Sequence, residues 1–163
     1  MEIVRRAEIW ERLAVGDAQL ARAAEAAFLV APRPGAFEVT LLLTDDTEMR
    51  ELNRAWRGKD AATNVLSFPA GVSVAQGGEP RPLGDVVLAA ETVQREAEAQ
   101  GVSPADHVSH LVVHGVLHLL GFEHENDANA EKMEALETKV LAGLDIADPY
   151  AEPAAKTREE VSS

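Results

Sequence analysis

The sequence predicts a small α/β protein in which helices pack on one β-sheet. Two apolar, strand-like segments, FEVTLLLT at 37–44 and LGDVVLAA at 83–90, alternate along the chain with segments that have helical periodicity. With 163 residues the chain is long enough for one substantial core. An apolar content of 46% and a charged content of 26% are typical of a globular protein. We therefore expect one domain at residues 1–150.

The first half of the chain is expected to alternate strands and helices. Residues 2–10 predict an edge strand, and an alanine-rich helix at 18–30 ends at a cluster of Pro and Gly. The strand at 37–44 leads through an acidic N-cap region into a helix at 45–56. The core-facing side chains of that helix are expected to be Met49, Leu52 and Trp56. A short strand at 64–68 is closed by Pro69.

The second half is expected to be mostly helical. Residues 70–83 contain Gly and Pro without periodicity, which predicts an exposed loop before the strand at 83–90. Helices are then predicted at 91–100, at 104–120 and at 126–141, so the whole chain holds about five. Ser103 and Pro104 are a favourable N-cap and first residue for the second of them. Residues 151–163 are polar and predict a disordered tail.

Charge and cysteine content narrow the classes of function. The formal net charge is -13, so a nucleic-acid partner would require a local basic groove on an acidic protein. The chain has no cysteine, which excludes disulfides, thiolate metal ligands and cysteine nucleophiles. The N-terminal sequence lacks the apolar core of a signal peptide, and no segment approaches the roughly 20 apolar residues that span a bilayer. We expect a cytoplasmic protein that does not bind membranes.

The segment HGVLHLLGFEH, residues 114–124, contains three of the five histidines. His114 and His118 are four residues apart, so a helix places both on one face, where they can bind one metal ion. His124 can join them only if the chain turns back, and Gly121 can end the helix in a left-handed conformation. Three neutral imidazoles and a water suit zinc in an open, catalytic site. Ordinary histidines on a half-buried helix are the alternative.

This spacing equals that of the long zinc-protease signature, H-E-x-x-H-x-x-G-x-x-H, with one difference. The signature has a glutamate after the first histidine as the general base, whereas this chain has Gly115. Peptide hydrolysis therefore loses its usual base. Glu123 is the carboxylate nearest to the three histidines in the sequence. It either accepts a hydrogen bond from a ligand ring or acts as a base, or it is a solvated loop residue.

Several polar residues outside this segment are candidates for the same site. Arg57 and Lys59 lie in a turn before a strand, and an arginine beside a metal can clamp a phosphate with its planar fork. Two solvated basic residues are the alternative. Ser67 interrupts an apolar strand and either points into a cleft as a substrate contact or belongs to a plain core strand. His107 and His110 share the helix face of His114 and are expected to support the metal ligands or to line the cleft rather than bind metal.

These motifs together resemble the YbeY family of endoribonucleases, also called rRNA maturation factors. The resemblance covers about residues 37–150 and rests, in this order, on RGKDAATNVLSFP, LGDVVLA, HLVVHGVLHLLGFEH, EKMEALE and DPY. The usual central signature of the family is H-G-x-L-H-L-x-G-[YF]-D-H. The chain departs from it once, with Glu123 at the aspartate position, which keeps the charge.

The resemblance implies a single YbeY-like metal-hydrolase domain at residues 1–150. Its sheet is expected to have about four strands, mostly parallel with one antiparallel, beside a zincin-like metal helix. One zinc ion is expected on His114, His118 and His124, and the family arginine matches Arg57. The implied activity is single-strand-specific RNA cleavage in maturation of the small-subunit rRNA 3′ end and in ribosome quality control. The implied partners are rRNA, the small ribosomal subunit, one small-subunit protein and an Era-type GTPase.

A zinc centre beside an arginine also fits phosphodiester chemistry. Zinc would polarise a phosphoryl oxygen or lower the pKa of a bound water, and Arg57 would stabilise the charge that develops on the phosphorus centre. Glu123, a cleft histidine and the RNA 2′-hydroxyl all remain candidates for the proton acceptor. Two other functions remain as alternatives. One is a zinc hydrolase of peptide or amide bonds, and the other is a non-catalytic ribosome-assembly factor with a structural zinc.

Overall fold

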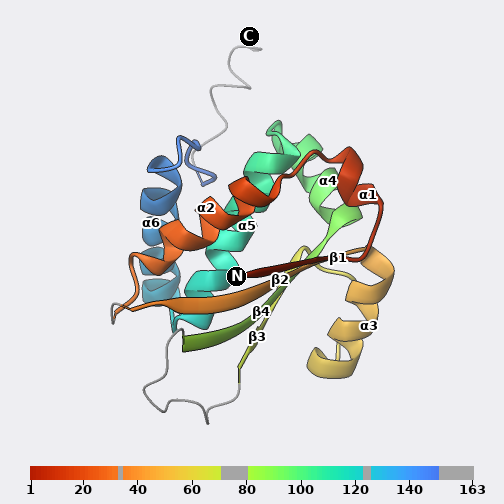
Figure 1. The fold of residues 1–163 in the computed structure, drawn as a ribbon, viewed down its shortest axis with the longest axis horizontal. Helices are drawn as coiled ribbons and strands as arrows, with labels where there is room; N and C mark the ends of the chain where they lie inside the picture. Colours follow the sequence, from red (N-terminus) through yellow and green to blue (C-terminus); the bar gives the residue numbers. More distant parts are fainter. Residues whose placement is uncertain (33–34, 71–80, 123–125, 151–163) are drawn as a thin grey trace.

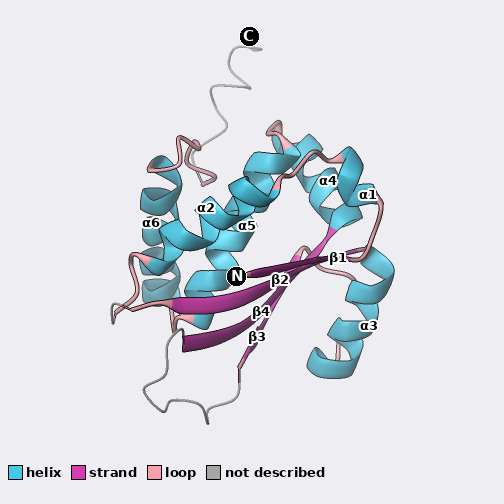
Figure 2. Cartoon of the chain, in the orientation of Figure 1, coloured by secondary structure: helices cyan, strands magenta, loops and turns pink. Residues whose placement is uncertain are grey.

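A computed structural model describes residues 1–32, 35–70, 81–122 and 126–150 of the chain. Its centre is one sheet with the strand order β1-β2-β4-β3, covered by helices (Figures 1 and 2). The strands are β1 (Glu2–Arg5), β2 (Phe37–Thr44), β3 (Val65–Pro69) and β4 (Arg81–Ala89). The β1–β2 and β2–β4 pairs are parallel, whereas β3 pairs antiparallel with β4. The predicted four-stranded, mostly parallel sheet is confirmed.

Six helices lie along the described chain. They are α1 (Ile9–Arg12), α2 (Asp17–Phe28), α3 (Asp46–Arg57), α4 (Ala90–Gln100), α5 (Pro104–Leu119) and α6 (Asp127–Ala142). Figure 1 shows α2, α4, α5 and α6 on one side of the sheet, with α5 behind α2, and α3 on its own beside the opposite side. All of the predicted longer helices are present, and α1 is the additional one.

Alternation along the strands explains this layering. Successive side chains of a strand point to opposite faces, so a strand buried on both faces can feed two separate cores. The larger core lies under α2, α4, α5 and α6 and takes from the sheet Leu41, Leu43, Val86 and Leu88. The smaller core lies under α3 and consists of Met49, Val87 and Ala89 with half-buried neighbours. The sheet therefore separates α5 from α3.

The N-terminal segment differs from its prediction as one long strand over residues 2–10. The strand β1 ends at Arg5, and the short helix α1 follows. Trp10 is fully buried in α1, and its indole N–H donates a hydrogen bond to the carbonyl of Thr44 at 2.8 Å. Because this large side chain enters the core at the end of β2, the chain turns away from the sheet edge. The pattern of apolar residues does not distinguish this turn from a continued strand.

Two further differences concern residues next to β3. The strand β4 starts at Arg81, inside the predicted loop at 70–83, because Arg81 pairs with Phe37 at the start of β2. Trp56 was expected to face the core, but its side chain is 70% exposed in the last turn of α3.

Residues 71–80 of the predicted loop and the predicted tail at 151–163 lie outside the described residues. No helix within the described ranges is long and apolar enough to cross a membrane.

Candidate functional site

Helix α5 carries the predicted metal-binding histidines and is the most enclosed helix of the larger core. The Ser103 side chain caps its start by accepting a hydrogen bond from the Asp106 backbone N–H at 3.0 Å. The helix then packs against β3 and β4 and against α2, α4 and α6. From its second turn onward, half-buried positions recur every four residues, at His110, His114 and His118. The histidines therefore form the accessible strip of an otherwise buried helix.

His114 and His118 lie side by side on this strip, as their four-residue spacing predicts. Their ring centroids are 6.1 Å apart, and the ring planes differ by 14°. Nδ1 of His114 lies 2.5 Å from Oε2 of Glu137, and Nδ1 of His118 lies 3.1 Å from the carbonyl oxygen of Phe122. The ring orientation of each histidine is thus fixed by an acceptor on its Nδ1.

These two hydrogen bonds also assign the tautomer of each ring. A carbonyl oxygen and an ionised carboxylate only accept hydrogen bonds, so the proton of His114 and of His118 lies on Nδ1. In the neutral ring Nε2 then carries the lone pair, which is the state in which imidazole binds a metal. Metal-binding histidines usually donate their other N–H to a carboxylate or to a backbone carbonyl, as here. The two histidines therefore fit a divalent metal such as zinc.

The chain turns at the end of α5 as the motif predicts. The helix ends at Leu119, and Gly121 has a φ of 106°, a conformation that favours glycine. The Phe122 backbone N–H then donates to the carbonyl of Leu117 at 3.1 Å, which brings the Phe122 carbonyl back to His118. Within the described ranges no group of three His, Cys, Asp or Glu residues is arranged to hold a metal. The predicted residues Glu123 and His124 lie outside those ranges.

Gly115 faces the sheet and not the accessible strip. A Cβ atom added to it would lie 2.8 Å from Cγ1 of Val86 and 3.1 Å from Oγ of Ser67. Real Cβ atoms essentially never come as close to another heavy atom as the first of these distances. A glutamate at this position would point into the contact between α5 and the sheet. The glycine therefore reflects close packing, and the protease base has no room at this position.

Glu137 of α6 connects three residues beneath the histidine strip. Its side chain is 1% exposed, and its Oε1 lies 3.0 Å from Nε2 of His110 and 2.5 Å from the hydroxyl of Tyr150. Burial alone would raise the pKa of this carboxyl. The hydrogen bonds from His110, His114 and Tyr150 outweigh burial and lower the pKa to about 2, so Glu137 is ionised. Burial and the same carboxylate raise the pKa of Tyr150.

The sequence does not single out Glu137 or Tyr150 as site residues. They occur only in EKMEALE and DPY, two of the segments on which the family resemblance rests. One signal was available, because Met133, Glu137, Val140 and Leu141 follow helical spacing and three of the four are apolar. A glutamate within an apolar stripe indicates a buried carboxylate that requires partners.

His107 and His110, which were expected to support the metal ligands or to line the cleft, differ from each other in their surroundings. His110 is mostly buried and supports the same carboxylate as His114, as described above. His107 is 4% exposed, and its Nε2 lies 2.8 Å from Oε1 of Glu96 on α4. Asn64 donates to the same oxygen of Glu96 at 2.9 Å. His107 therefore links α5 to α4 inside the protein.

Arg57 approaches the histidine helix through β3, the edge strand of the sheet. Its guanidinium donates to the carbonyl oxygen of Ser67 at 2.7 Å, and the Ser67 hydroxyl donates to the carbonyl of Gly115 at 3.2 Å. A single residue of β3 thus separates Arg57 from the residue that follows His114. Arg57 is otherwise exposed.

Ser67 and Lys59 differ in how much of each side chain a substrate can reach. Ser67 is 8% exposed, and its hydroxyl joins β3 to α5 instead of lying on an open surface. This position fits the core-strand interpretation better than a cleft contact, because the hydroxyl is enclosed between sheet and helix. Lys59 lies in the exposed turn after α3, where its backbone N–H donates to the carbonyl of Asn53 at 3.2 Å. Lys59 is accessible, and a role in substrate binding remains a prediction.

Comparisons with known proteins identify the family of the chain. The family described as endoribonuclease YbeY matches residues 12–145. Endoribonuclease YbeY of Azorhizobium caulinodans is 58% identical over 121 residues, which cover 74% of this chain and 76% of that protein. The Rhodospirillum rubrum protein of the same name is 51% identical over 154 residues, with 88% and 77% covered.

A solved structure supports the fold independently. The solution structure of TM1509 from Thermotoga maritima has a TM-score of 0.50 and 22% sequence identity, covering 93% of this chain and 99% of that one. At this identity the likeness concerns the fold alone, and the relatives above carry the assignment. The chain therefore belongs to the endoribonuclease YbeY family, enzymes that cleave the phosphodiester bonds of RNA.

Proposed function

We propose that the protein is a zinc-dependent endoribonuclease specific for single-stranded RNA. In this proposal one zinc ion is bound by His114, His118 and His124. The observation that carries it is the pair of Nδ1 hydrogen bonds that leaves His114 and His118 in the metal-binding tautomer. The proposed substrate is the precursor of small-subunit rRNA, processed at its 3′ end, and the same activity would serve ribosome quality control.

Bound zinc, Glu137 and Arg57 would have separate roles in RNA cleavage. Bound zinc would supply a Lewis acid for the scissile phosphate. Glu137 holds the His114 ring in place through Nδ1. One N–H of the Arg57 guanidinium donates to the Ser67 carbonyl oxygen. The guanidinium is otherwise exposed, so its remaining N–H groups can donate to phosphate oxygens as negative charge develops during cleavage.

The groups that could accept the proton during cleavage are few. Glu137 and the Phe122 carbonyl already accept from the Nδ1 atoms of His114 and His118. Glu123 is therefore left with two roles, as the acceptor for the His124 ring or as the base for the attacking group. The 2′-hydroxyl of RNA is the substrate-derived alternative for the attacking group. A peptidase with the same three histidines is disfavoured, because position 115 has no room for its glutamate.

The ribosome supplies the proposed cellular context. We propose that the protein works in the cytoplasm with the small ribosomal subunit, one small-subunit protein and an Era-type GTPase. The net charge of -13 opposes tight binding to free RNA, so much of the affinity would come from other contacts on the ribosome. A tight, salt-sensitive complex with naked RNA would contradict this part of the proposal.

Zinc content and cleavage of an rRNA precursor, measured on the same samples, test the function. The wild-type protein should contain one zinc and cleave the precursor, a chelator should stop cleavage, and added zinc should restore it. His114→Ala should lose both zinc and cleavage because it removes a ligand, whereas Leu29→Ala, at an 87% exposed position, should keep both. Stoichiometric zinc in His114→Ala would reject the three-histidine site. Equal cleavage by His114→Ala would show that a contaminating ribonuclease causes the activity.

A further inference from the structure

Helix α3 and the turn after it concentrate positive charge in an acidic protein. Residues 50–59 contain four of the fifteen Lys and Arg residues and a single acidic residue, Glu51, in a chain whose net charge is -13. Arg50, Arg54 and Arg57 are spaced by four and three residues and therefore share one face of α3. This segment is a local basic surface of the kind that RNA binding requires.

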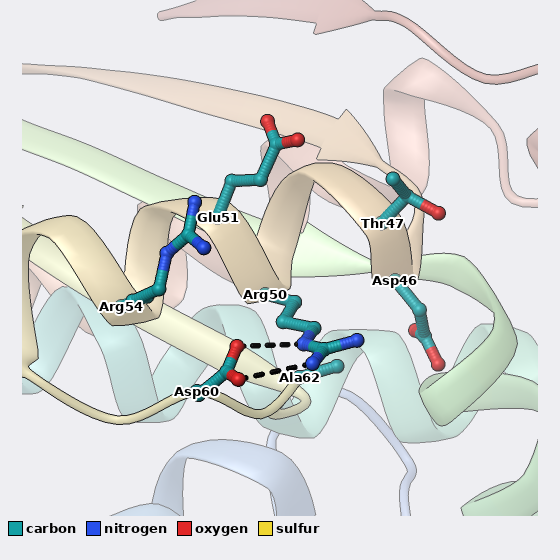
Figure 3. A pocket seen from close by; sticks show the side chains of 7 residues that line it. All are labelled: Asp46, Thr47, Arg50, Glu51, Arg54, Asp60 and Ala62. Carbon is teal, nitrogen blue, oxygen red and sulfur yellow. Dashed lines mark hydrogen bonds and ion pairs between the residues drawn. The ribbon is translucent and has the colours of Figure 1, made fainter.

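The basic surface is compensated at one end only. A hollow of about 450 Å³ lies along α3. Figure 3 shows Asp46 at one end of its lining residues and Arg54 at the other. Arg50 is held there by two hydrogen bonds to Asp60, at 2.7 and 3.0 Å. Within the described part of the chain, Arg54, Arg57 and Lys59 make no ion pair. Asp60 also interacts electrostatically with Arg54, so the least compensated charges, those of Arg57 and Lys59, lie at the C-terminal end of α3 and in the turn after it.

An exposed tryptophan lies at this same end. Trp56 is 70% exposed although the apolar pattern of α3 predicts that it faces the core. Its ring meets the ring of Phe68 at 72°, with a centroid distance of 6.4 Å, and the Arg57 guanidinium lies 5.5 Å from the centroid of the same Phe68 ring. An indole, a phenyl ring and a guanidinium therefore form one cluster beside the edge strand β3.

This cluster matches the chemistry of single-stranded nucleic acid recognition. Proteins bind unpaired bases by stacking them on aromatic rings and bind the adjoining phosphates with basic side chains. A base-paired helix presents its bases already stacked, so an exposed indole discriminates in favour of an unpaired strand. An acidic protein surface with its least compensated basic side chains at this one place is complementary in charge to a phosphate backbone.

We propose that Trp56 stacks on an unpaired base of the RNA substrate while Arg54 and Arg57 contact the phosphates beside it. The hydrogen bonds from Arg57 to Ser67 and from Ser67 to Gly115 place this contact next to the helix of His114. A strand held at α3 then passes the edge of β3 on its way to the histidines. The inference rests on the proposed endoribonuclease function and names an additional binding residue for the same substrate.

Tryptophan fluorescence provides a direct test, because the two tryptophans differ in exposure. Trp10 is fully buried and Trp56 is exposed, so quenching by an added oligonucleotide reports on Trp56. The zinc-loaded protein is titrated with a short single-stranded 2′-O-methyl RNA whose integrity is verified after each titration. We expect this RNA to quench the fluorescence, and a strand of equal charge with abasic residues or a duplex to quench it far less.

Variants separate stacking from charge. Trp56→Leu should weaken oligonucleotide binding by about 5- to 150-fold, the range for loss of one stacked base. It should also raise KM for RNA with little change in kcat, because it removes binding common to ground and transition states. Trp56→Phe should keep most of the affinity, and Leu29→Ala should match wild type. Thermal melting shows whether each variant is folded.

Each contrary result has a distinct meaning. Wild-type affinity in Trp56→Leu, or equal quenching by the abasic strand, rejects stacking even if the protein cleaves RNA. Absence of any quenching by RNA also rejects it and points to a protein partner for this surface. If RNA quenches the Trp56 fluorescence of the wild-type protein but is never cleaved by it, the endoribonuclease proposal fails while the stacking contact stands.

Discussion

The histidine strip of α5 and the basic end of α3 contribute to one proposed site but are held very differently. His114 is fixed by a carboxylate that is 1% exposed and that also binds His110 and Tyr150. Arg57 makes one hydrogen bond to a backbone carbonyl, and Trp56 beside it is 70% exposed. A metal tolerates little displacement of its ligands, whereas an RNA strand needs accessible groups that adapt to it. The protein is rigid where it would bind metal and open where it would bind RNA.

This contrast has energetic consequences that mutations can separate. Removing one partner from a buried hydrogen-bonded charge leaves the other unpaired, which costs stability as well as function. Changing an exposed residue usually alters the free energy of unfolding by less than about 0.5 kcal/mol. Variants of the α5–α6 network should therefore change stability and metal binding together. Variants at the end of α3 should change RNA cleavage alone.

Among variants at the basic end of α3, Arg57→Glu should have the largest effect on activity. Loss of a group that stabilises developing charge typically lowers kcat by about 100- to 1000-fold, and the new carboxylate also repels the phosphate. Zinc content and melting temperature should stay close to wild type because Arg57 is exposed. Arg22→Glu, an exposed arginine on α2, makes the same charge change and should cleave normally. Undiminished cleavage by Arg57→Glu would remove Arg57 from the site.

Glu137→Gln tests whether Glu137 positions the histidines of α5 for metal binding. The neutral amide keeps the shape of the side chain but weakens the hydrogen bond that orients His114, so zinc affinity should fall by about 10- to 100-fold. Isothermal titration of zinc-free protein measures this directly. Glu134→Gln changes an exposed glutamate of the same helix and should bind zinc normally. Zinc affinity equal to wild type would show that Glu137 supports the fold without positioning the ligand.

Much of the fold was predictable because local signals agreed with the tertiary arrangement. The Ser103 cap is present as the sequence predicts, and Asp45, within the predicted acidic cap region, caps α3. The strand β4 ends in a continuously apolar segment at 86–89 that is buried on both faces, and β2 has one fully apolar face, which predicts central strands of the sheet. Helix α1 was not predictable in this way. It is four residues long and exists because Trp10 enters the core.

The site was predictable only where its residues are close in sequence. His114 and His118 are one helical turn apart, so their juxtaposition follows from helix geometry. Glu137 reaches His114 from a different helix, 23 residues along the chain, and only the packing of α6 on α5 reveals it. Trp56 shows the opposite case, because its spacing is right for the core but its place beside the sheet edge leaves it exposed.

Gly115→Ala probes the contact between α5 and β4 that supports the histidine strip. It should have the smallest effect on the protein of these variants. The added methyl would lie 2.8 Å from Cγ1 of fully buried Val86, and such overpacking costs about 1 to 3 kcal/mol. Replacing glycine by alanine within a helix stabilises by up to about 1 kcal/mol, so the net loss should be at most about 2 kcal/mol. The melting temperature should fall by up to roughly 8 °C. Gly16→Ala, whose Cβ would meet nothing within 4 Å, should melt within about 2 °C of wild type. A Gly115→Ala protein more stable than wild type would mean that α5 moves freely against β4, and the histidines beside it would then not be rigidly held.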